Sequence, residues 1–311
     1  MITHRSDPAL AIRALRSAAP YIRMYKGRTF VVKAGGGVFA EMATTRALVE
    51  QIGILHYFGV RVVLVHGGGP QLTELSAALG IPTRMVDGRR VTDEKSIDVT
   101  AMVLNGLINT RLLSMCRDLG IDAVGVSGVD AGLVRAHRRP PVALAANGEV
   151  VDFGFVGDID AVDTSVLQKL LDNGLMPVVS PLSADASGTL LNINADTVAA
   201  AIGAALGAEK LMLCTAAPGI LGNLEDPGSL ISYIDLRGLE RLRAQGRIAA
   251  GMLPKARAIE EALRGGVRRV HVVSYRSPEG ILGEVFTNEG TGTLIVADLD
   301  TLPAAEQQSA P

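Results

Sequence analysis

Two apolar runs near the start of the chain each end in a cluster of glycines, and this repeat constrains the fold most. Residues 29–37 read TFVVKAGGG, and residues 61–70 read RVVLVHGGGP. Short β-branched runs bounded by glycine favour buried strands over helices. Because helical patterns follow at 41–58 and 71–79, the sequence predicts a βαβ unit with two parallel strands.

The glycine clusters suit anion binding. Glycine lets backbone N–H groups approach a phosphate closely, and a helix that begins there adds the positive end of its dipole. Two such loops at one edge of a parallel sheet suit a phosphoryl group that passes between two bound molecules, and Lys33 would supply a point charge. Neither loop fits the P-loop or dinucleotide-binding pattern. For each cluster alone, the alternative is an ordinary turn.

Composition is typical of an α/β enzyme. Of the 311 residues, 48% are hydrophobic and 35 are glycine, and strand and helix patterns alternate. The formal net charge of −2 gives no basic surface for nucleic acid. Two cysteines cannot form a disulfide framework, and we find neither a signal-peptide pattern nor an apolar run of membrane-spanning length. We therefore expect a soluble, cytoplasmic protein.

The first helix is expected over residues 7–25, with Asp7 as its N-cap and Pro8 in its first turn. Pro20 is expected to kink or interrupt it. Apolar residues recur along it at a helical period with arginines between them. This apolar face either packs on its own subunit or meets a helix of another subunit.

Two arginines precede a long helical pattern in the first half of the chain. Asp93 is expected to cap this helix, which runs to about residue 119. Adjacent arginines usually belong to a solvated face. However, one of Arg89 and Arg90 is well placed to bind a carboxylate bidentately.

Polar residues gather again in the second half of the chain. Asn192, Asn194 and Asp196 are more than one helix cap requires, and either Asn194 or Asp196 is expected to be that cap. Asn192 is suited to hydrogen-bonding a substrate, and Asp196 to holding lysines or a metal-bound phosphate. Lys255 begins another helix, where the dipole disfavours a positive charge, so we expect it to have an anionic partner unless it is a flexible surface lysine.

The remaining patterns continue the alternation and predict a sheet in two tightly joined lobes, the first ending near residue 181. The expected strands are 123–126, 176–180, 210–213 and 270–274, with a β-rich stretch at 133–156 that contains an exposed loop at 138–141; the expected helices are 163–173, 197–206 and 251–263; a final hairpin-like segment covers 284–295 and a disordered tail follows residue 298.

Five of these clusters, in this order, resemble the motifs of the amino-acid kinase family. They are Val32–Gly36, His66–Pro70, Gly88–Asp93, Asn192–Asp196 and Gly251–Lys255. The resemblance covers about residues 8–297. It implies a three-layer α/β/α fold with an open, mainly parallel sheet and an extra N-terminal helix. It also implies an oligomerisation helix at 1–26, an acyl-amino-acid-binding lobe at 27–181, a nucleotide-binding lobe at 182–298 and a tail at 299–311.

The resemblance further implies a reaction, in which ATP with Mg²⁺ phosphorylates the side-chain carboxylate of N-acetyl-L-glutamate. Lys33 and Lys255 would stabilise the transferring group, and Asp196 would orient both lysines. The protein would supply no metal ligand of its own. The implied binding residues are Gly35 and Gly36 for phosphate and Gly68, Gly69, Arg90 and Asn192 for substrate.

Arginine-inhibited members of the family carry an N-terminal helix that joins dimers into a hexamer, and residues 7–25 match it. Their arginine site corresponds to His271, Glu284 and Gly290, and Tyr21 would cover the ligand's alkyl stem. We therefore expect a homo-oligomer, a dimer or a hexamer, with arginine as a feedback inhibitor. The alternative is that Glu284 is a surface charge beside a strand.

Three positions depart from the family pattern. Ala216 replaces a common aspartate beside the nucleotide site, Val129 replaces a common lysine, and Gly37 replaces an asparagine or alanine. Ala216 bears most directly on ATP use.

Two other functions remain open. A non-catalytic arginine-sensing domain has the same fold but no need for Lys33, Asp196 and Lys255. A kinase for a related N-acylated dicarboxylic acid differs by about one methylene, which a pocket discriminates by only ~1–3 kcal/mol.

Overall fold

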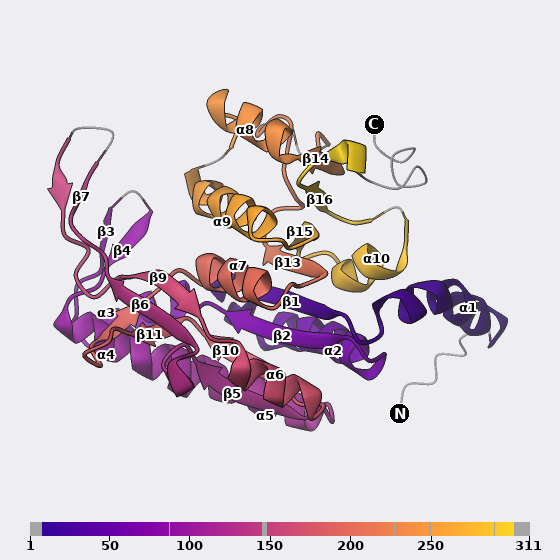
Figure 1. Ribbon diagram of the computed structural model, residues 1–311, viewed down its shortest axis with the longest axis horizontal. Helices are drawn as coiled ribbons and strands as arrows, with labels where there is room; N and C mark the ends of the chain where they lie inside the picture. The colour runs from indigo at the N-terminus through magenta and orange to yellow at the C-terminus, as the bar shows by residue number, and fades with distance from the viewer. Residues whose placement is uncertain are drawn as a thin grey trace.

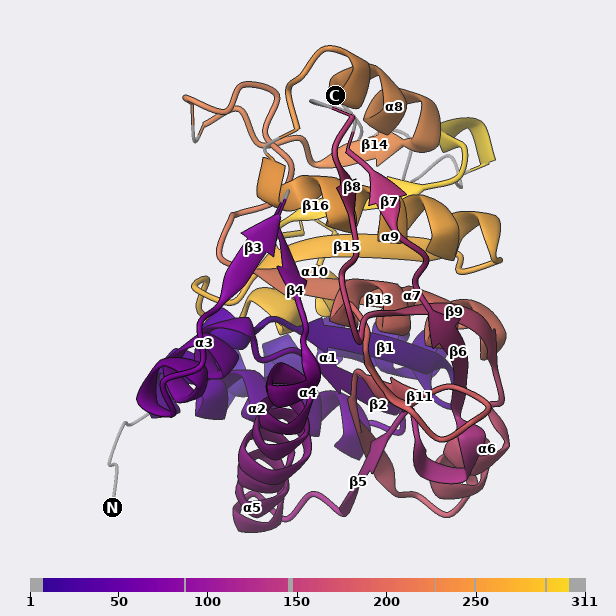
Figure 2. The same cartoon turned by 90° about the vertical axis from the view of Figure 1, so that its left-hand side faces the viewer.

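The chain folds around a mainly parallel central sheet, as Figures 1 and 2 show for the computed structural model. The structure describes residues 8–86, 88–144, 148–226, 228–248, 250–288 and 290–301. Within these ranges the sheet has eight strands, and every neighbouring pair is parallel except β15 and β16. Across the sheet they are β14 (Tyr233–Asp235), β16 (Thr293–Val296), β15 (Arg269–Ser274), β13 (Lys210–Thr215), β1 (Thr29–Ala34), β2 (Arg61–His66), β10 (Met176–Ser180) and β5 (Ala123–Ser127).

β1 lies at the centre of the sheet, between strands from the two halves of the chain. It pairs with β2 on one side and β13 on the other, so that Lys33 stands opposite both Val65 and Leu213. Because these strands are parallel, the loops that follow them emerge at one edge. The predicted lobes therefore share one continuous sheet, and a boundary near residue 181 stays a prediction.

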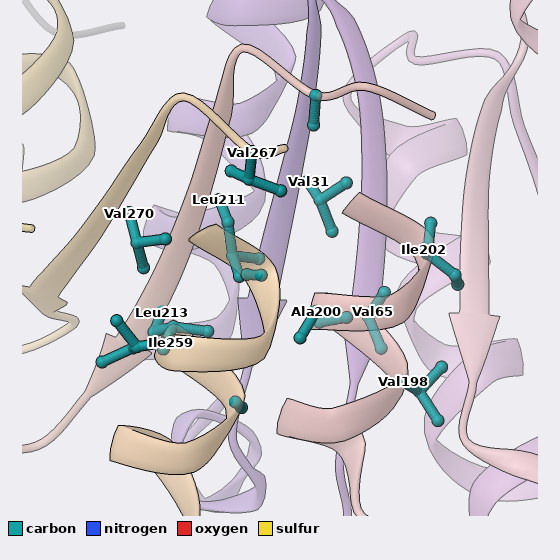
Figure 3. Close-up of a cluster of buried hydrophobic side chains, with 14 of the residues drawn as sticks. Val31, Val65, Val198, Ala200, Ile202, Leu211, Leu213, Ile259, Val267 and Val270 are labelled. Carbon is teal, nitrogen blue, oxygen red and sulfur yellow. The ribbon is translucent and has the colours of Figure 1, made fainter. Parts of the chain in front are cut away.

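Helices cover both faces of the sheet and complete the three expected layers (Figure 1). Alternate residues of β1 point to opposite faces, so Val31 and Phe30 belong to separate hydrophobic clusters. Figure 3 shows the first cluster, where Val198 and Ile259 from two helices meet Val31 and Val65. This face carries α6 (Ser165–Asp172), α7 (Ala195–Ala205), α8 (Leu236–Ala244) and α9 (Leu253–Arg264); the other carries α2 (Met42–Tyr57), α3 (Gly69–Ala78), α4 (Glu94–Ala101), α5 (Thr110–Asp118) and α10 (Gly280–Phe286).

A smaller sheet and two short antiparallel pairs complete the described part of the chain. The smaller sheet has the order β12–β11–β6–β9, and the pairs are β3–β4 and β7–β8. The β-rich stretch expected at 133–156 is confirmed by three of these strands. Their bounds are β3 (Arg84–Val86), β4 (Arg89–Val91), β6 (Val134–Arg138), β7 (Val142–Ala143), β8 (Val150–Val151), β9 (Gly157–Val162), β11 (Leu182–Ala184) and β12 (Leu190–Asn192), and the short helical turns are η1 (Gly36–Ala40), η3 (Asp130–Gly132), η4 (Ala250–Met252) and η5 (Leu299–Thr301).

The long helix expected after Asp93 forms, with one unexpected segment. Asp93 caps it by accepting a hydrogen bond from the backbone N–H of Ser96 at 2.8 Å. Between α4 and α5 the chain is π-helical, in η2 (Met102–Asn109). By length and hydropathy, residues 94–118 match a membrane span, contrary to the expectation that no segment would, but half of the apolar window is buried inside the protein. A core helix passes the same test.

The N-terminal helix α1 (Pro8–Tyr25) forms where it was expected, and Asp7 lies outside the described residues. The helix runs through Pro20 without interruption, so the expected interruption was wrong, while the expected kink stays a prediction. Proline removes a hydrogen bond to the carbonyl of Arg16, an exposed residue whose carbonyl water can satisfy. Leu10 and Leu15 are each 60% exposed, whereas Tyr25 at the end of the helix is buried, so only part of the helix packs on its own subunit.

The prediction of a hairpin-like segment at 284–295 was also wrong. Glu284 lies in helix α10, and β16 pairs instead with β15. Ile281 and Val285 are spaced four residues apart and are both buried in the core, which stabilises a helix over a strand. Residues 299–301 form η5 rather than a disordered tail, and residues 302–311 lie outside the described residues.

Candidate functional site

A cleft of about 690 Å³ lies at the edge of the sheet where β1 and β2 end. Residues from both halves of the chain line it, because the central strand β1 has neighbours from both. All nine residues predicted to be catalytic, substrate-binding or phosphate-binding lie in its wall. They are Lys33, Gly35, Gly36, Gly68, Gly69, Arg90, Asn192, Asp196 and Lys255.

Two lysines meet one buried carboxylate in this cleft. Lys255 Nζ donates a hydrogen bond to Asp196 Oδ2 at 2.8 Å, and Lys33 Nζ lies 2.8 Å from Oδ1 as an ion pair. The three side chains come from β1, the start of α7 and the start of α9. Lys255 thus has the anionic partner that its position at a helix N-terminus predicts. The cluster carries two positive charges and one negative charge.

Burial and mutual charge set the ionisation of this cluster. Burial is the main cause that lowers the pKa of Lys33, and the nearby positive charge of Lys255 lowers it further, whereas Asp196 opposes the shift. Burial works against ionisation of Asp196, but Lys33 and Lys255 outweigh it, so the pKa of Asp196 is lowered. The carboxylate of Asp196 therefore stays ionised between the two lysines, both of which line the cleft.

Local structure explains why Asp196 is held so firmly. Asn194 caps α7, since its side-chain oxygen accepts hydrogen bonds from the backbone N–H groups of Asp196 at 2.8 Å and Thr197 at 3.4 Å. Asn194 is therefore the helix cap that the sequence assigned to either Asn194 or Asp196. Because Asn194 caps the helix, both carboxylate oxygens of Asp196 can pair with the two lysines.

The two glycine loops touch each other. A Cβ at Gly36 would lie 2.6 Å from Pro70 Cδ and 2.9 Å from the backbone nitrogen of Gly69, so only glycine fits without a shift. Gln71 Nε2 donates to the carbonyl of Gly36 at 2.9 Å and fastens the first loop to α3. At Gly68 a Cβ would lie 2.5 Å from Ile108 Cδ1. Close packing by itself therefore favours glycine at both positions.

The two predicted substrate-binding side chains are held by neighbours. Arg90 donates to Thr73 Oγ1 at 2.7 Å and to the carbonyl of Gly69 at 3.2 Å, which ties strand β4 to the second glycine loop. Asn192 donates to the buried Thr92 Oγ1 at 3.2 Å. Both groups are oriented before any ligand arrives.

Sequence reasoning missed an arginine in the cleft wall. Arg139 lines the cleft and is held bidentately by Asp158, with Nε 3.0 Å from Oδ1. The sequence placed residues 138–141 in an exposed loop, because adjacent arginines and prolines are typical of loops. No local signal distinguishes Arg139 from Arg138, which instead lies over Phe155 outside the cleft lining.

The residues predicted to bind arginine form a second cluster away from the cleft. His271 Nδ1 lies 2.7 Å from Glu284 Oε1, and Glu284 Oε2 accepts from the backbone N–H groups of Thr291 at 2.6 Å and Gly292 at 3.0 Å. Gly290, with φ +64°, faces Glu284. Glu284 is therefore buried on a helix, and its reading as a surface charge beside a strand is wrong.

Two further residues complete the surroundings of this cluster. Lys210 Nζ lies 3.0 Å from His271 Nε2. The hydroxyl of Tyr21 donates to Asn288 Oδ1, which links α1 to the segment after α10. The structure therefore brings His271, Glu284 and Gly290 together, whereas the hydroxyl of Tyr21 bonds to Asn288.

Comparison with known proteins identifies the family to which this fold belongs. Residues 28–274 match the model of the amino acid kinase family. The chain belongs to this family. Among curated relatives, the acetylglutamate kinase of Myxococcus xanthus is 48% identical over 94% of this chain and 96% of its own length.

Solved structures of N-acetylglutamate synthase from Neisseria gonorrhoeae also share the fold. One, complexed with coenzyme A and N-acetyl-glutamate, is 28% identical with a TM-score of 0.80; it matches 92% of this amino acid kinase chain but only 63% of its own chain. Another, complexed with coenzyme A and L-arginine, is 27% identical with a TM-score of 0.77, over 92% of this chain and 65% of its own. This chain thus spans less than two thirds of the synthase.

The buried His66, at the end of β2, generates a pH prediction. Burial lowers its pKa to about 4, and Asn109 Nδ2 donates to its Nε2 at 3.2 Å, which requires the neutral ring. In the unfolded chain the pKa of a histidine is about 6.5, so the unfolded state takes up a proton at a higher pH than the folded state does. The free energy of unfolding therefore falls as the pH drops from 6.5 to 4, by at most about 1.4 kcal/mol per pH unit. Thermal melts of the wild type and His66→Gln should show a shallower slope in the variant. An NMR titration midpoint above pH 6 for His66 would contradict this.

Proposed function

We propose that this amino acid kinase phosphorylates the side-chain carboxylate of N-acetyl-L-glutamate with ATP, forming N-acetyl-L-glutamyl 5-phosphate and ADP in arginine biosynthesis. The Myxococcus xanthus acetylglutamate kinase supports this assignment, because the match covers nearly the whole of both proteins. The observation that carries the proposal is the cluster of Lys33, Asp196 and Lys255 in a cleft with two glycine loops. We place this reaction in the cytoplasm.

The proposed roles follow from charge and position. Phosphoryl transfer requires little covalent chemistry from the protein, so catalysis is mostly positioning and charge stabilisation. Lys33 and Lys255 stabilise the negative charge of the transferring group, and Asp196 holds both ammonium groups in place. The N–H groups of Gly35 and Gly36 bind phosphate oxygens, and no side chain acts as a nucleophile.

Substrate binding uses the wall on the side of β4 and β12. The guanidinium group of Arg90 matches a carboxylate by paired hydrogen bonds. Asn192 binds the N-acetyl or α-carboxylate end, and the loop of Gly68 and Gly69 supplies backbone donors. The attacking carboxylate oxygen then faces the phosphate bound near Lys33.

Mg²⁺ fits this site as a companion of the nucleotide. The described residues contain no group of three or more His, Cys, Asp or Glu side chains suited to a metal ion. Both oxygens of Asp196 already face lysines. Mg²⁺ commonly keeps its waters and binds substrate phosphates, where it neutralises their charge, so it would enter with ATP.

A non-catalytic arginine sensor is the competing assignment. The lysines oppose it, because a sensor has no need for two ammonium groups around one carboxylate in the cleft. Sequence identity opposes it as well, since this chain is 48% identical to the Myxococcus xanthus kinase but 28% identical to the synthase. A kinase for a related N-acylated dicarboxylic acid would use the same residues.

The first test removes each lysine. We expect Lys33→Ala and Lys255→Ala each to lower kcat about 10²–10³-fold, with a much smaller change in KM for the acyl amino acid, because both charges act on the transition state. The measurement is ADP release with N-acetyl-L-glutamate and its longer homologue. Lys169→Ala, on the distant helix α6, is the control. Unchanged turnover in both variants would remove the mechanism.

The second test concerns substrate orientation. Arg90→Ala should raise KM for N-acetyl-L-glutamate roughly 10- to 150-fold, the equivalent of about 1.5–3 kcal/mol of charged hydrogen bonding. KM for ATP should change little. Arg84→Ala, in the neighbouring strand β3 and outside the cleft, is the matched control. An unaltered KM for the acyl amino acid would show that Arg90 does not bind it.

Feedback regulation by L-arginine is the second part of the proposal. The Neisseria gonorrhoeae synthase structure with L-arginine supports it, as does the cluster of His271, Glu284 and Gly290 beside α1. The exposed apolar residues of α1, such as Leu10 and Leu15, suit a helix of another subunit. We therefore propose that α1 joins dimers into a hexamer and that arginine binds near Glu284 and Tyr21.

The test measures inhibition and size together. Arginine inhibits only if it binds one arrangement of the protein better than another. We expect millimolar L-arginine to inhibit the full-length hexamer, Glu284→Gln to relieve the inhibition, and removal of residues 1–25 to yield active dimers in light scattering. Glu279→Gln, at the exposed start of α10, is the control. A full-length dimer that ignores arginine would refute the regulatory part and leave the kinase assignment intact.

A further inference from the structure

Tyr275 fills the space of a side chain that Gly37 lacks. A Cβ built at position 37 would lie 2.7 Å from the Tyr275 hydroxyl oxygen, closer than real Cβ contacts come, and 3.5 Å from the ring atom Cζ. A side chain at this position would therefore require the tyrosine hydroxyl to move, whereas the ring atoms could stay in place. The glycine that departs from the family pattern at this position thus leaves room for the hydroxyl of Tyr275.

The contact joins segments that are far apart in the sequence. Tyr275 directly follows β15, and its backbone N–H donates to the carbonyl of Thr215 at the end of β13 at 2.9 Å. Gly37 lies in η1, just after β1. β15, β13 and β1 lie next to one another in the sheet, in this order. The tyrosine therefore reaches from the second half of the chain across β13 to the loop after β1.

The same loop is fastened on its other side. Gln71 donates to the carbonyl of Gly36, and Pro70 lies against Gly36. The loop of residues 35–37 is thus held between α3 and Tyr275. Gly35 and Gly36 line the cleft, whereas Gly37 and Tyr275 do not.

We propose that Tyr275 is a positioning residue for phosphoryl transfer, whose hydroxyl packs on Gly37 and fixes the glycine loop against the bound nucleotide. The inference rests on the proposed kinase function. Tyr275 acts through the loop and touches no reacting atom. Its loss therefore weakens the use of ATP, while binding of the acyl amino acid at Arg90 is unaffected.

A double-mutant cycle on the full-length enzyme tests this. Tyr275→Phe should lower kcat and raise KM for ATP, with KM for N-acetyl-L-glutamate unchanged. Gly37→Ala should be more damaging, because its Cβ meets the hydroxyl oxygen. In the double variant the nearest ring atom is 3.5 Å away, so the alanine becomes tolerable and the cycle should show coupling of about 10-fold or more in kcat/KM for ATP.

Two controls separate this role from general stability and from the kinase assignment. Tyr57→Phe removes an exposed hydroxyl that donates to Leu119 and should match the wild type. Calorimetric affinity for the ATP analogue AMP-PNP should fall in Tyr275→Phe whether or not N-acetyl-L-glutamate is the acceptor. The proposal is overturned if Gly37→Ala is equally damaging in both backgrounds, or if Tyr275→Phe leaves kcat, KM for ATP and AMP-PNP affinity unchanged.

Discussion

The meeting of two ammonium groups at one buried carboxylate is the interaction on which the rest of this site depends. Burying the ammonium group of Lys33 is unfavourable, and removal of its partner Asp196 would leave an uncompensated charge in the core. Asp196 offsets this cost for both lysines at once, and Asn194 fixes the helix turn that carries it. The sheet order makes the meeting possible, because β1 has neighbours from both halves of the chain.

Much of the architecture was predictable from local patterns. The β-branched runs ending in glycine became the adjacent strands β1 and β2, and the cap at Asp93 formed as its residue type predicts. The gathering of Lys33, Asp196 and Lys255 was expected through the family resemblance. Spacing alone could not place Lys255 beside Asp196, since 58 residues separate them and only the tertiary fold brings helices α7 and α9 together.

The failures have physical causes. Glu284 was expected near a strand because the glycines and threonines after it are typical of a hairpin, whereas burial of Ile281 and Val285 makes the segment a helix. Arg139 was assigned to an exposed loop, whereas it lines the cleft and is held there by an ion pair with Asp158. The π-helical segment from Met102 to Asn109 has no sequence signature that we recognise.

The central position of β1 also has a consequence for how the chain folds during synthesis. One side of β1 pairs with β2 almost at once, but the other pairs with β13, ~180 residues later, so the protein has a high contact order. Until β13 leaves the ribosome, the open edge of β1 presents unpaired backbone groups and apolar side chains, a template for intermolecular pairing. The strand that brings the two halves of the cleft together is therefore also the point at which a nascent chain is most exposed to aggregation.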